Sequence, residues 1–242
     1  MRLDRFVNRK TQCGQKRVRQ LLAAGQIRLD GEICNEGTRA INQFSRVELA
    51  GELLQEGRPY YLMLHKPRAC VSATRDKKHP TVVDLIKESY RSELHIAGRL
   101  DFNTTGLMLL TNDGQWSRRI TEPAEKKPKT YLLTTQDPMT VEYKRQFSRG
   151  IYLAREAMTT HSAELEIIEP RLARLTIYEG RYHQVKRMLG FFNNRVLSLH
   201  RERMGSIVLD PLLQAGHYRP LSALEIASVT ASCKHTGKPN GD

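Results

Sequence analysis

Short apolar runs separated by tight turns are the feature that most restricts the fold of this chain. The first, YYLMLHKP at 60–67, is typical of a buried strand that Pro67 ends. Because neighbouring runs are often joined by short turns, as at IEPRLAR, we expect an α+β fold with a mixed or largely antiparallel sheet rather than a doubly wound one. The pattern predicts further strands at 107–111, 131–135, 163–168, 172–178, 195–200 and 207–209, and helices at 82–90, 115–120, 141–147 and 183–189.

The start of the chain has a different pattern. Residues 1–30 carry eight Lys or Arg against two Asp. Apolar residues recur at helical spacing twice, first before and then after the CGQ break, and Gly25 is a natural stop for the second helix. Lys16, Arg17 and Arg19 fall away from the apolar face of that helix, where phosphates could bind them. QIRLDGEIC then alternates around Asp30-Gly31, which predicts a hairpin.

The charge balance indicates a polyanionic partner. The 242 residues contain 39 Lys or Arg and 26 Asp or Glu, a net charge of +13, which a solvated surface does not require. Nucleic acid and an anionic membrane surface both fit this charge. The longest apolar runs are too short to span a bilayer, however, and MRLDRFVNRK lacks the apolar core of a signal peptide. We therefore expect a cytoplasmic protein without a membrane segment.

The sequence does not indicate a metal or a cofactor. Its four cysteines are scattered without a C-x-x-C pair, and its eight histidines show no metal-ligand spacing. Neither a Walker loop nor G-x-G-x-x-G occurs. We expect no disulfide framework, no bound metal and no cofactor.

Two helices and a tight hairpin, all basic, resemble the S-four-like RNA-binding domain over roughly residues 1–51. The family usually has a serine cap before the second helix, where this chain has GQKR. The alternative interpretation is an ordinary helical hairpin with a solvated charged side. GELLQEGRP at 51–59 is interpreted as a linker. We therefore expect an S-four-like domain at 1–57, a larger domain at 58–230 and a disordered tail at 231–242.

Four segments of the larger domain carry a second resemblance. YLMLHKP, GRLDFNTTGL, KTYLLT and LTIYEGRYHQVKRM, in this order and spacing, resemble the pseudouridine synthases that act on ribosomal RNA and pair an S-four-like domain with the catalytic one. The likeness extends to about Ser228. The finer pattern in DGQWSRRIT, EGRYHQVKRM and LHRERMG is most similar to the branch that modifies small-subunit rRNA.

The resemblance assigns the catalytic role to Asp101. Pseudouridylation breaks the N1–C1′ bond of uridine, rotates the uracil and rebuilds the bond through C5, so it needs one positioned carboxylate and neither cofactor nor metal. By the resemblance, Lys186 is the basic partner of Asp101 and Tyr131 packs on the target base. Leu175 and Ile177 form the apolar wall of the pocket. Arg99 contacts a phosphate or fills the gap that a flipped base leaves.

The expected partner is ribosomal RNA of a partly assembled small subunit, bound by a monomer. The residues expected to bind RNA outside the pocket are Lys16, Arg17, Arg19, Arg181 and Arg187.

The sequence departs from the family pattern at two positions, and three rival functions remain open. Relatives usually read Asn-Lys-Pro-x-Gly where this chain has His65 and Ala69 at the first and last positions. The rivals are a synthase that acts on large-subunit rRNA, a non-catalytic ribosome-associated RNA-binding protein, and a nucleic-acid N-glycosylase. The glycosylase would need a second acid to activate water, for which Glu179 is the candidate.

Overall fold

The computed structural model describes residues 1–122 and 127–230, which form two compact units that divide between Pro59 and Tyr60. The expected disordered tail at 231–242 lies outside the described residues. No helix among the described residues is both long and apolar enough to cross a membrane.

The first unit packs two helices on a small sheet. Helices α1 (Leu3–Thr11) and α2 (Gln15–Ala23) precede the four-stranded sheet β2-β1-β3-β4. Its core includes Phe6 of α1 and Val18 and Leu22 of α2, so the apolar face that the helical spacing predicted is buried on each helix. The predicted hairpin is confirmed, since Asp30 and Gly31 both have positive φ between paired strands. The strands are β1 (Ile27–Leu29), β2 (Glu32–Ile33), β3 (Val47–Leu49) and β4 (Glu52–Gln55).

Two details of this unit bear on the sequence predictions. Helix α2 follows Gly14 without a side-chain cap hydrogen bond, as the missing serine implies. The interpretation of 51–59 as a linker was wrong in part, because Glu52–Gln55 pairs with β3 as strand β4. The dipeptide Ala50-Gly51, with positive φ at both residues, is the turn of this hairpin.

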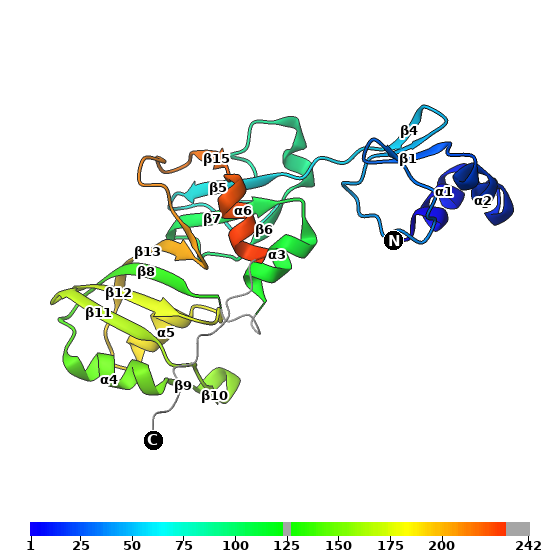
Figure 1. Ribbon diagram of the computed structural model, residues 1–242. Helices are drawn as coiled ribbons and strands as arrows, with labels where there is room; N and C mark the ends of the chain where they lie inside the picture. Colours follow the sequence, from blue (N-terminus) through cyan, green and yellow to red (C-terminus); the bar gives the residue numbers. More distant parts are fainter. Residues whose placement is uncertain (123–126, 231–242) are drawn as a thin grey trace, which may run out of the picture. The chain divides into compact units, whose positions relative to one another are not determined.

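The second unit is built on a mixed sheet, which confirms the expected α+β class (Figure 1). Its main path runs β11-β12-β8-β13-β7-β5-β15, with β14 beside β13 and β6 beside β7. All its pairings are antiparallel except β13 with β7. The strands are β5 (Tyr61–Lys66), β6 (His95–Ala97), β7 (Thr105–Thr111), β8 (Lys129–Thr135), β11 (Glu164–Glu169), β12 (Leu172–Ile177), β13 (Val196–Met204), β14 (Ile207–Val208) and β15 (Tyr218–Pro220).

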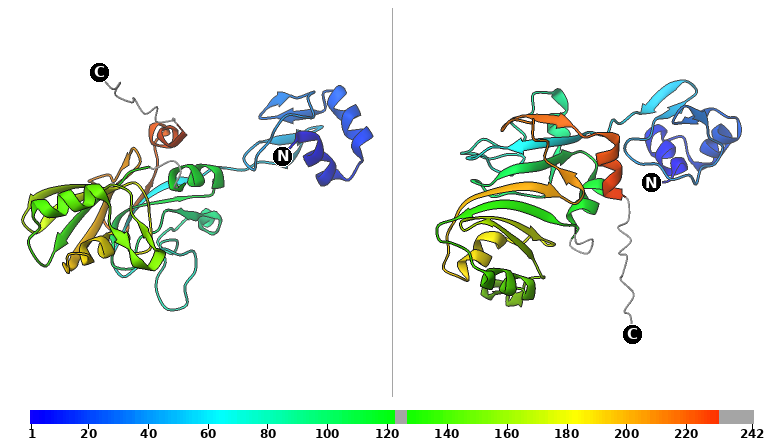
Figure 2. Two further views of the ribbon diagram at one scale, coloured as in Figure 1. Left: turned by 90° about the horizontal axis from the view of Figure 1, so that it is seen from below. Right: turned by 60° about the vertical axis from the view of Figure 1, so that its left-hand side comes forward.

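Helices cover both faces of this sheet (Figures 1 and 2). Alternate residues of a strand point to opposite faces, so Leu62 and Leu64 of β5 join one core and Met63 joins the other. Helices α4 (Val141–Arg149) and α5 (Gln184–Gly190) pack on the first core, and α3 (Gly114–Thr121) and α6 (Ala223–Thr230) pack on the second. The smaller elements β9 (Tyr152–Leu153), β10 (Met158–Thr159) and the 3-10 turn η3 (Ala154–Glu156) also belong to this unit.

The predicted helix at 82–90 was wrong. The segment forms successive turns, followed by the 3-10 helix η1 (Ser89–Glu93). The backbone N–H and the hydroxyl of Thr81 both donate to Asp84 Oδ2, at 2.9 and 2.8 Å. The backbone bonds that follow join residues three apart, Asp84 N–H to Thr81 O and Ile86 N–H to Val83 O, so the chain makes tight turns rather than an α-helix. Val82 and Ile86 are buried in the core, so their spacing indicated burial correctly but the wrong backbone.

Candidate active site

Asp101 lies in the loop that joins β6 to β7, and its carboxylate faces the start of helix α5. Lys186 Nζ lies 2.7 Å from Asp101 Oδ2. His183 Nε2 lies 3.4 Å from the other oxygen, Oδ1. The Asp101 side chain is 25% exposed, so the carboxylate is paired with a cation and still open to a ligand. The structure thus brings together the two residues that the resemblance had paired.

Buried Lys66 fixes the second half of this loop, which runs from Phe102 to Thr104. Its side chain is fully buried, and Nζ donates to the carbonyl oxygens of Pro67, Phe102 and Thr104 at 3.0, 3.1 and 2.9 Å. Burial lowers the pKa of Lys66 to about 8, while the charge of nearby Asp101 acts in the opposite direction. Two of the three acceptors belong to the loop itself, so the ammonium fixes the backbone that carries Asp101.

Arg201 of strand β13 holds the beginning of the same loop. Its side chain is 1% exposed. Nε donates to Leu107 O at 2.8 Å, Nη2 to Gly98 O at 3.1 Å and Nη1 to Arg99 O at 3.4 Å. A Cβ at Gly106 would lie 2.3 Å from the carbonyl oxygen of Arg201, which explains why the strands can approach so closely only with glycine there.

Sequence reasoning missed the positions of Lys66 and Arg201 at the base of the site. Lys66 appeared only as part of the HKPRA segment, and the predicted strand at 195–200 ended one residue before Arg201. The available signal was the alternation in LHRERM, which places Arg201 on the same side of its strand as buried Leu199. A buried arginine in a strand requires acceptors, and a loop with exposed carbonyls supplies them.

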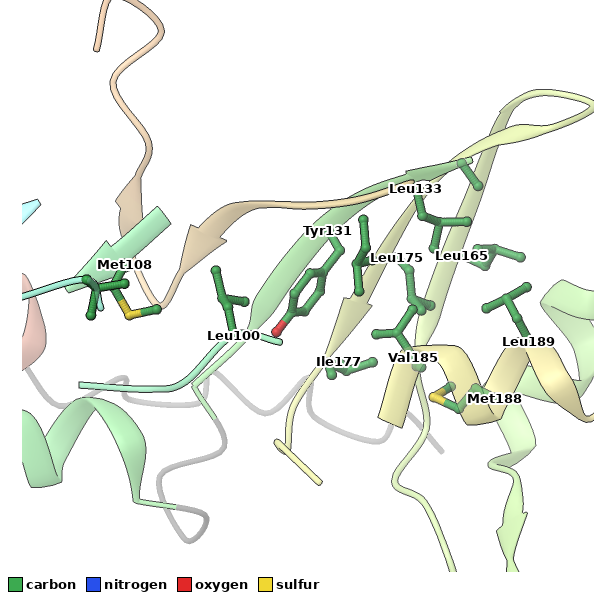
Figure 3. Packing of buried hydrophobic residues seen from close by; sticks show 14 of the residues in the cluster. Leu100, Met108, Tyr131, Leu133, Leu165, Leu175, Ile177, Val185, Met188 and Leu189 are labelled. Carbon is green, nitrogen blue, oxygen red and sulfur yellow. The ribbon is translucent and has the colours of Figure 1, made fainter. Parts of the chain in front are cut away.

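Tyr131 lies on strand β8 next to the residues expected to form the apolar wall. Its register partner on β12 is Leu175. Figure 3 shows its ring among Leu100, Leu175 and Ile177, and Leu100 immediately precedes Asp101. Tyr131 is only 7% exposed, so little of the ring is available to a base in this form. Contact of these residues with uracil stays a prediction.

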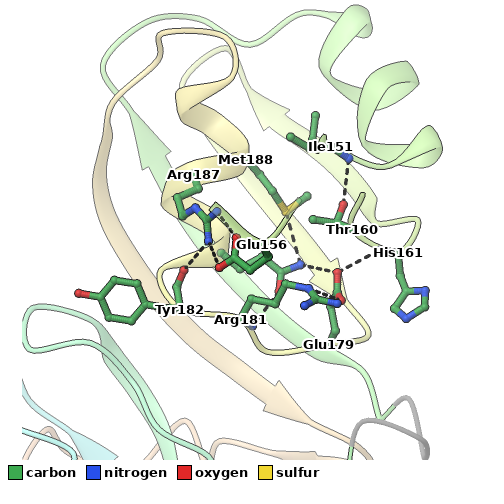
Figure 4. Close-up of polar contacts among 10 residues, drawn as sticks. Ile151, Glu156, Thr160, His161, Glu179, Arg181, Tyr182, Arg187 and Met188 are labelled. Carbon is green, nitrogen blue, oxygen red and sulfur yellow. Dashed lines mark hydrogen bonds and ion pairs between the residues drawn. The ribbon is translucent and has the colours of Figure 1, made fainter. Parts of the chain in front are cut away.

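Glu179 is fully engaged by its neighbours (Figure 4). It is 6% exposed. One carboxylate oxygen accepts from the backbone N–H of His161 and from Gln184 Nε2, both at 2.9 Å, and the other accepts from Arg181 Nε at 2.8 Å. A carboxylate held in this way anchors the turn before α5, and has little capacity left to activate water.

The two arginines expected to bind RNA near α5 are both ion-paired. Arg181 contacts Glu179. The guanidinium of Arg187 bonds both oxygens of Glu156, with one distance of 2.7 Å, and the carbonyl of Tyr182 at 3.3 Å. The side chain of Arg99, by contrast, is exposed. Lys16, Arg17 and Arg19 are exposed on α2, opposite buried Val18, Leu21 and Leu22.

An aromatic pair beside Asp101 was also missed. The rings of Tyr182 and His183 stack with centroids 3.9 Å apart and an interplanar angle of 19°. His183 has φ 49° as the residue before α5, a conformation that turns its ring toward Asp101. Tyr182 is 60% exposed. The residues YH inside the EGRYHQVKRM segment were the only signal.

No group of three or more His, Cys, Asp or Glu side chains that could hold a metal ion occurs in the described ranges 1–122 and 127–230. In these ranges, the charged or titratable side chains that contact the Asp101 carboxylate are the Lys186 ammonium and the His183 imidazole.

Comparison with known proteins identifies the family. The family described as RNA pseudouridylate synthase matches residues 60–190. A relative from Pseudomonas aeruginosa, ribosomal small subunit pseudouridine synthase A, is 55% identical over 230 residues, which are 95% of this chain and 100% of that protein. The protein of the same name from Escherichia coli (strain K12) is 44% identical over 95% of this chain and 100% of its own length.

A solved structure gives the same result. The crystal structure of a pseudouridylate synthase is 40% identical in sequence and superimposes with a TM-score of 0.70, over 95% of this chain and 99% of that one. The resemblance inferred from the motifs is thereby confirmed, and the chain belongs to the RNA pseudouridylate synthase family.

Proposed function

We propose that this enzyme converts a uridine of small-subunit (16S) rRNA to pseudouridine, with Asp101 as the catalytic carboxylate. The observation that carries the proposal is the Asp101–Lys186 pair at 2.7 Å, on a loop that Lys66 and Arg201 hold through its backbone. Two relatives that match nearly the whole chain are named for the small ribosomal subunit, which supports this choice of RNA.

The reaction is a balanced isomerisation. The carboxylate of Asp101 acts at the sugar while the N1–C1′ bond breaks. The uracil rotates, the C5–C1′ bond forms, C5 loses its proton to solvent and N1 gains one. Lys186 Nζ, 2.7 Å from Asp101 Oδ2, orients the carboxylate toward the sugar. No group is imported, so the proposal includes neither cofactor nor metal.

Some residues of the proposed pocket contact the uracil base, and others contact the phosphates of the RNA. In the proposal Tyr131, Leu175 and Ile177 contact the flipped uracil, since they share one core beside the Asp101 loop. Flipping costs a few kcal/mol, and contacts to phosphate offset it. In the proposal, exposed Arg99 contacts a phosphate or fills the gap that the flipped base leaves. For Arg181 and Arg187, RNA binding would compete with Glu179 and Glu156.

The rest of the proposal concerns the substrate particle. Lys16, Arg17 and Arg19 of the first unit, which we infer to be an S-four-like domain, grip an RNA helix while the second unit acts on a nearby base. The target lies in structured RNA, so a monomer in the cytoplasm acts before the mature subunit closes over it. The N-glycosylase alternative is disfavoured by the three hydrogen bonds that occupy Glu179.

Tritium release from C5-labelled uridine tests this function. We expect release from partly assembled small-subunit particles or from 16S fragments with bound protein, little from mature subunits and none from transfer RNA. Preferential release from large-subunit rRNA would replace the proposed substrate with the large-subunit alternative. An absence of release from every RNA, with RNA binding intact, would favour the non-catalytic RNA-binding protein.

A further inference from the structure

A groove of about 600 Å³ adjoins the Asp101 loop on the face of the sheet that carries α5. Lys186, the partner of Asp101, lines it, so the groove begins at the candidate active site. Besides Lys186, its lining comes from Arg68 after β5, from Asn103 and Thr104 of the Asp101 loop, and from residues between Gly190, the last of α5, and Leu199, in the first half of β13.

The charged residues that line the groove are all cations. None of its described lining residues is Asp or Glu, whereas Arg68, Lys186 and Arg195 are cations. The side chains of Arg68 and Arg195 are exposed. Arg68 makes one long contact, from Nη2 to Leu197 O at 3.4 Å, and Arg195 has no side-chain hydrogen bond or ion pair among the described residues. Other arginines of this unit, such as Arg174, are paired with carboxylates.

A buried hydroxyl in the wall of the groove lacks a partner. Thr104 is 1% exposed, yet its Oγ1 makes no hydrogen bond within the described residues. Its backbone is fixed, because its N–H donates to Asp101 O at 3.1 Å and its carbonyl accepts from Lys66. A buried polar group without a partner is costly. Thr104 lines the groove, so a ligand in the groove can supply the missing partner.

We propose that this groove binds the single-stranded RNA segment next to the target uridine. Arg68 and Arg195 contact its phosphates, and the Thr104 hydroxyl bonds a ribose hydroxyl or a phosphate oxygen. The exposed amides of Asn103 and Asn193 add neutral donors and acceptors. Cations without acidic neighbours and uncharged polar groups suit a sugar-phosphate chain. The inference rests on the proposed function for the identity of the nucleotide at Asp101.

Thr104→Val separates ligand binding from folding. Valine keeps the shape and removes a hydroxyl that makes no hydrogen bond to the described residues, so the urea midpoint should stay the same or rise. Affinity of the full-length protein for a single-stranded 16S rRNA fragment should fall about three- to tenfold, as expected for one lost hydrogen bond. Thr104→Ser, which keeps the hydroxyl, should bind nearly as well as wild type. An unchanged affinity in Thr104→Val, or a clear loss of stability, contradicts the role assigned to Thr104.

The two arginines are tested by the salt dependence of binding. For Arg68→Gln with Arg195→Gln, the slope of log K against log salt should become shallower by about 1.4, at about 0.7 per lost phosphate contact on a single strand. The matched control is Arg118→Gln with Arg119→Gln, which removes the same charge from exposed positions on α3, at the opposite face of the sheet. If the two double variants have equal slopes, the proposal that this groove binds RNA is wrong.

The outcomes also distinguish this inference from the proposed function. If wild type releases no tritium but the slope still falls in the groove variant, the groove stands and the catalytic proposal fails. If wild type is active and the groove variants keep its KM, RNA affinity and salt slope, only the groove proposal is contradicted and the proposed function stands. Loss of binding to assembled particles with unchanged binding to naked RNA would assign the groove to a ribosomal protein instead.

Discussion

The ammonium of Lys186, on helix α5, lies 2.7 Å from the carboxylate of Asp101, on the loop between β6 and β7. Two structural elements must therefore be correctly placed before the pair can form. Lys66 and Arg201 fix the loop from beneath through carbonyl oxygens. The carboxylate thus contacts Lys186 and His183, while the backbone of its loop is held by Lys66 and Arg201.

Asp101→Asn should abolish tritium release and leave RNA affinity near that of wild type, because it removes the reacting carboxylate and little volume. The matched control is Glu169→Gln, the same chemical change at an exposed residue without a side-chain contact among the described residues. Measurable turnover by purified Asp101→Asn would contradict the catalytic assignment.

Lys186→Met should lower kcat far more than it raises KM. A hydrogen bond to a charged group contributes about 1.5–3 kcal/mol, so its loss in the transition state alone corresponds to about 10- to 150-fold in kcat. Lys186→Arg, which keeps the charge, should recover part of the rate. The measurement is single-turnover kinetics on a 16S fragment. Equal rates for the Met and Arg variants would show that charge at this position is unimportant.

Arg201→Met should reduce both stability and kcat, since it leaves three backbone carbonyls without their donor. Each buried group left unpaired costs about 1–3 kcal/mol, which urea unfolding will measure. In the folded fraction kcat should fall while KM changes little, because the loop that carries Asp101 loses its fixed position. The control is Arg203→Met, an exposed arginine on the same strand. A stable Arg201→Met variant with normal kcat would refute the positioning role.

As the pH rises above about 8, Lys66 should increase the free energy of unfolding and at the same time lower kcat. Burial lowers its pKa from 10.5 to about 8 in the folded protein. Between these values the unfolded chain binds more protons, so the Lys66 contribution to the free energy of unfolding rises with pH. Above about pH 8 the neutral amine has one donor fewer for its three carbonyls, so kcat should fall.

Titration of the Lys66 Nζ resonance by nitrogen NMR, assigned with Lys66→Arg, checks the first part, and kcat from pH 7 to 10 checks the second. Lys129, whose pKa burial also lowers to about 8, contributes to stability over the same range. A titration of Lys66 near its ordinary value would eliminate both effects.

Neutralising the basic helix of the first unit should weaken RNA binding without changing the chemical step. Replacing Lys16, Arg17 and Arg19 by Gln should make the salt slope shallower by about 2.7, at about 0.9 per phosphate on a double helix. All three side chains are exposed, so the fold should persist. A slope equal to that of wild type would mean that this face is only solvated.

The sequence by itself determined the local elements and the family. The helical spacing of Val18, Leu21 and Leu22 predicted a face that is buried, and Asp30-Gly31 predicted a hairpin that forms. These predictions succeed because the hydrogen bonds involved join residues close in sequence. The turns at 82–85 show the limit. Val82 and Ile86 are buried at helical spacing, but the backbone between them makes bonds three residues apart and no α-helix.

Only the tertiary structure decided how the site is supported. Motif order paired Asp101 with Lys186, but nothing local shows that Lys66 and Arg201 bond the carbonyls of one loop. Every residue has a backbone carbonyl, so the sequence does not show which carbonyls lie beside a buried cation. That depends on which strands are neighbours in the sheet. The parallel pairing of β13 with β7 brings Arg201 beside Gly106. The same packing leaves the Thr104 hydroxyl buried without a hydrogen bond to the described part of the chain, because fixing the loop takes up the backbone groups of Thr104 and not its side chain.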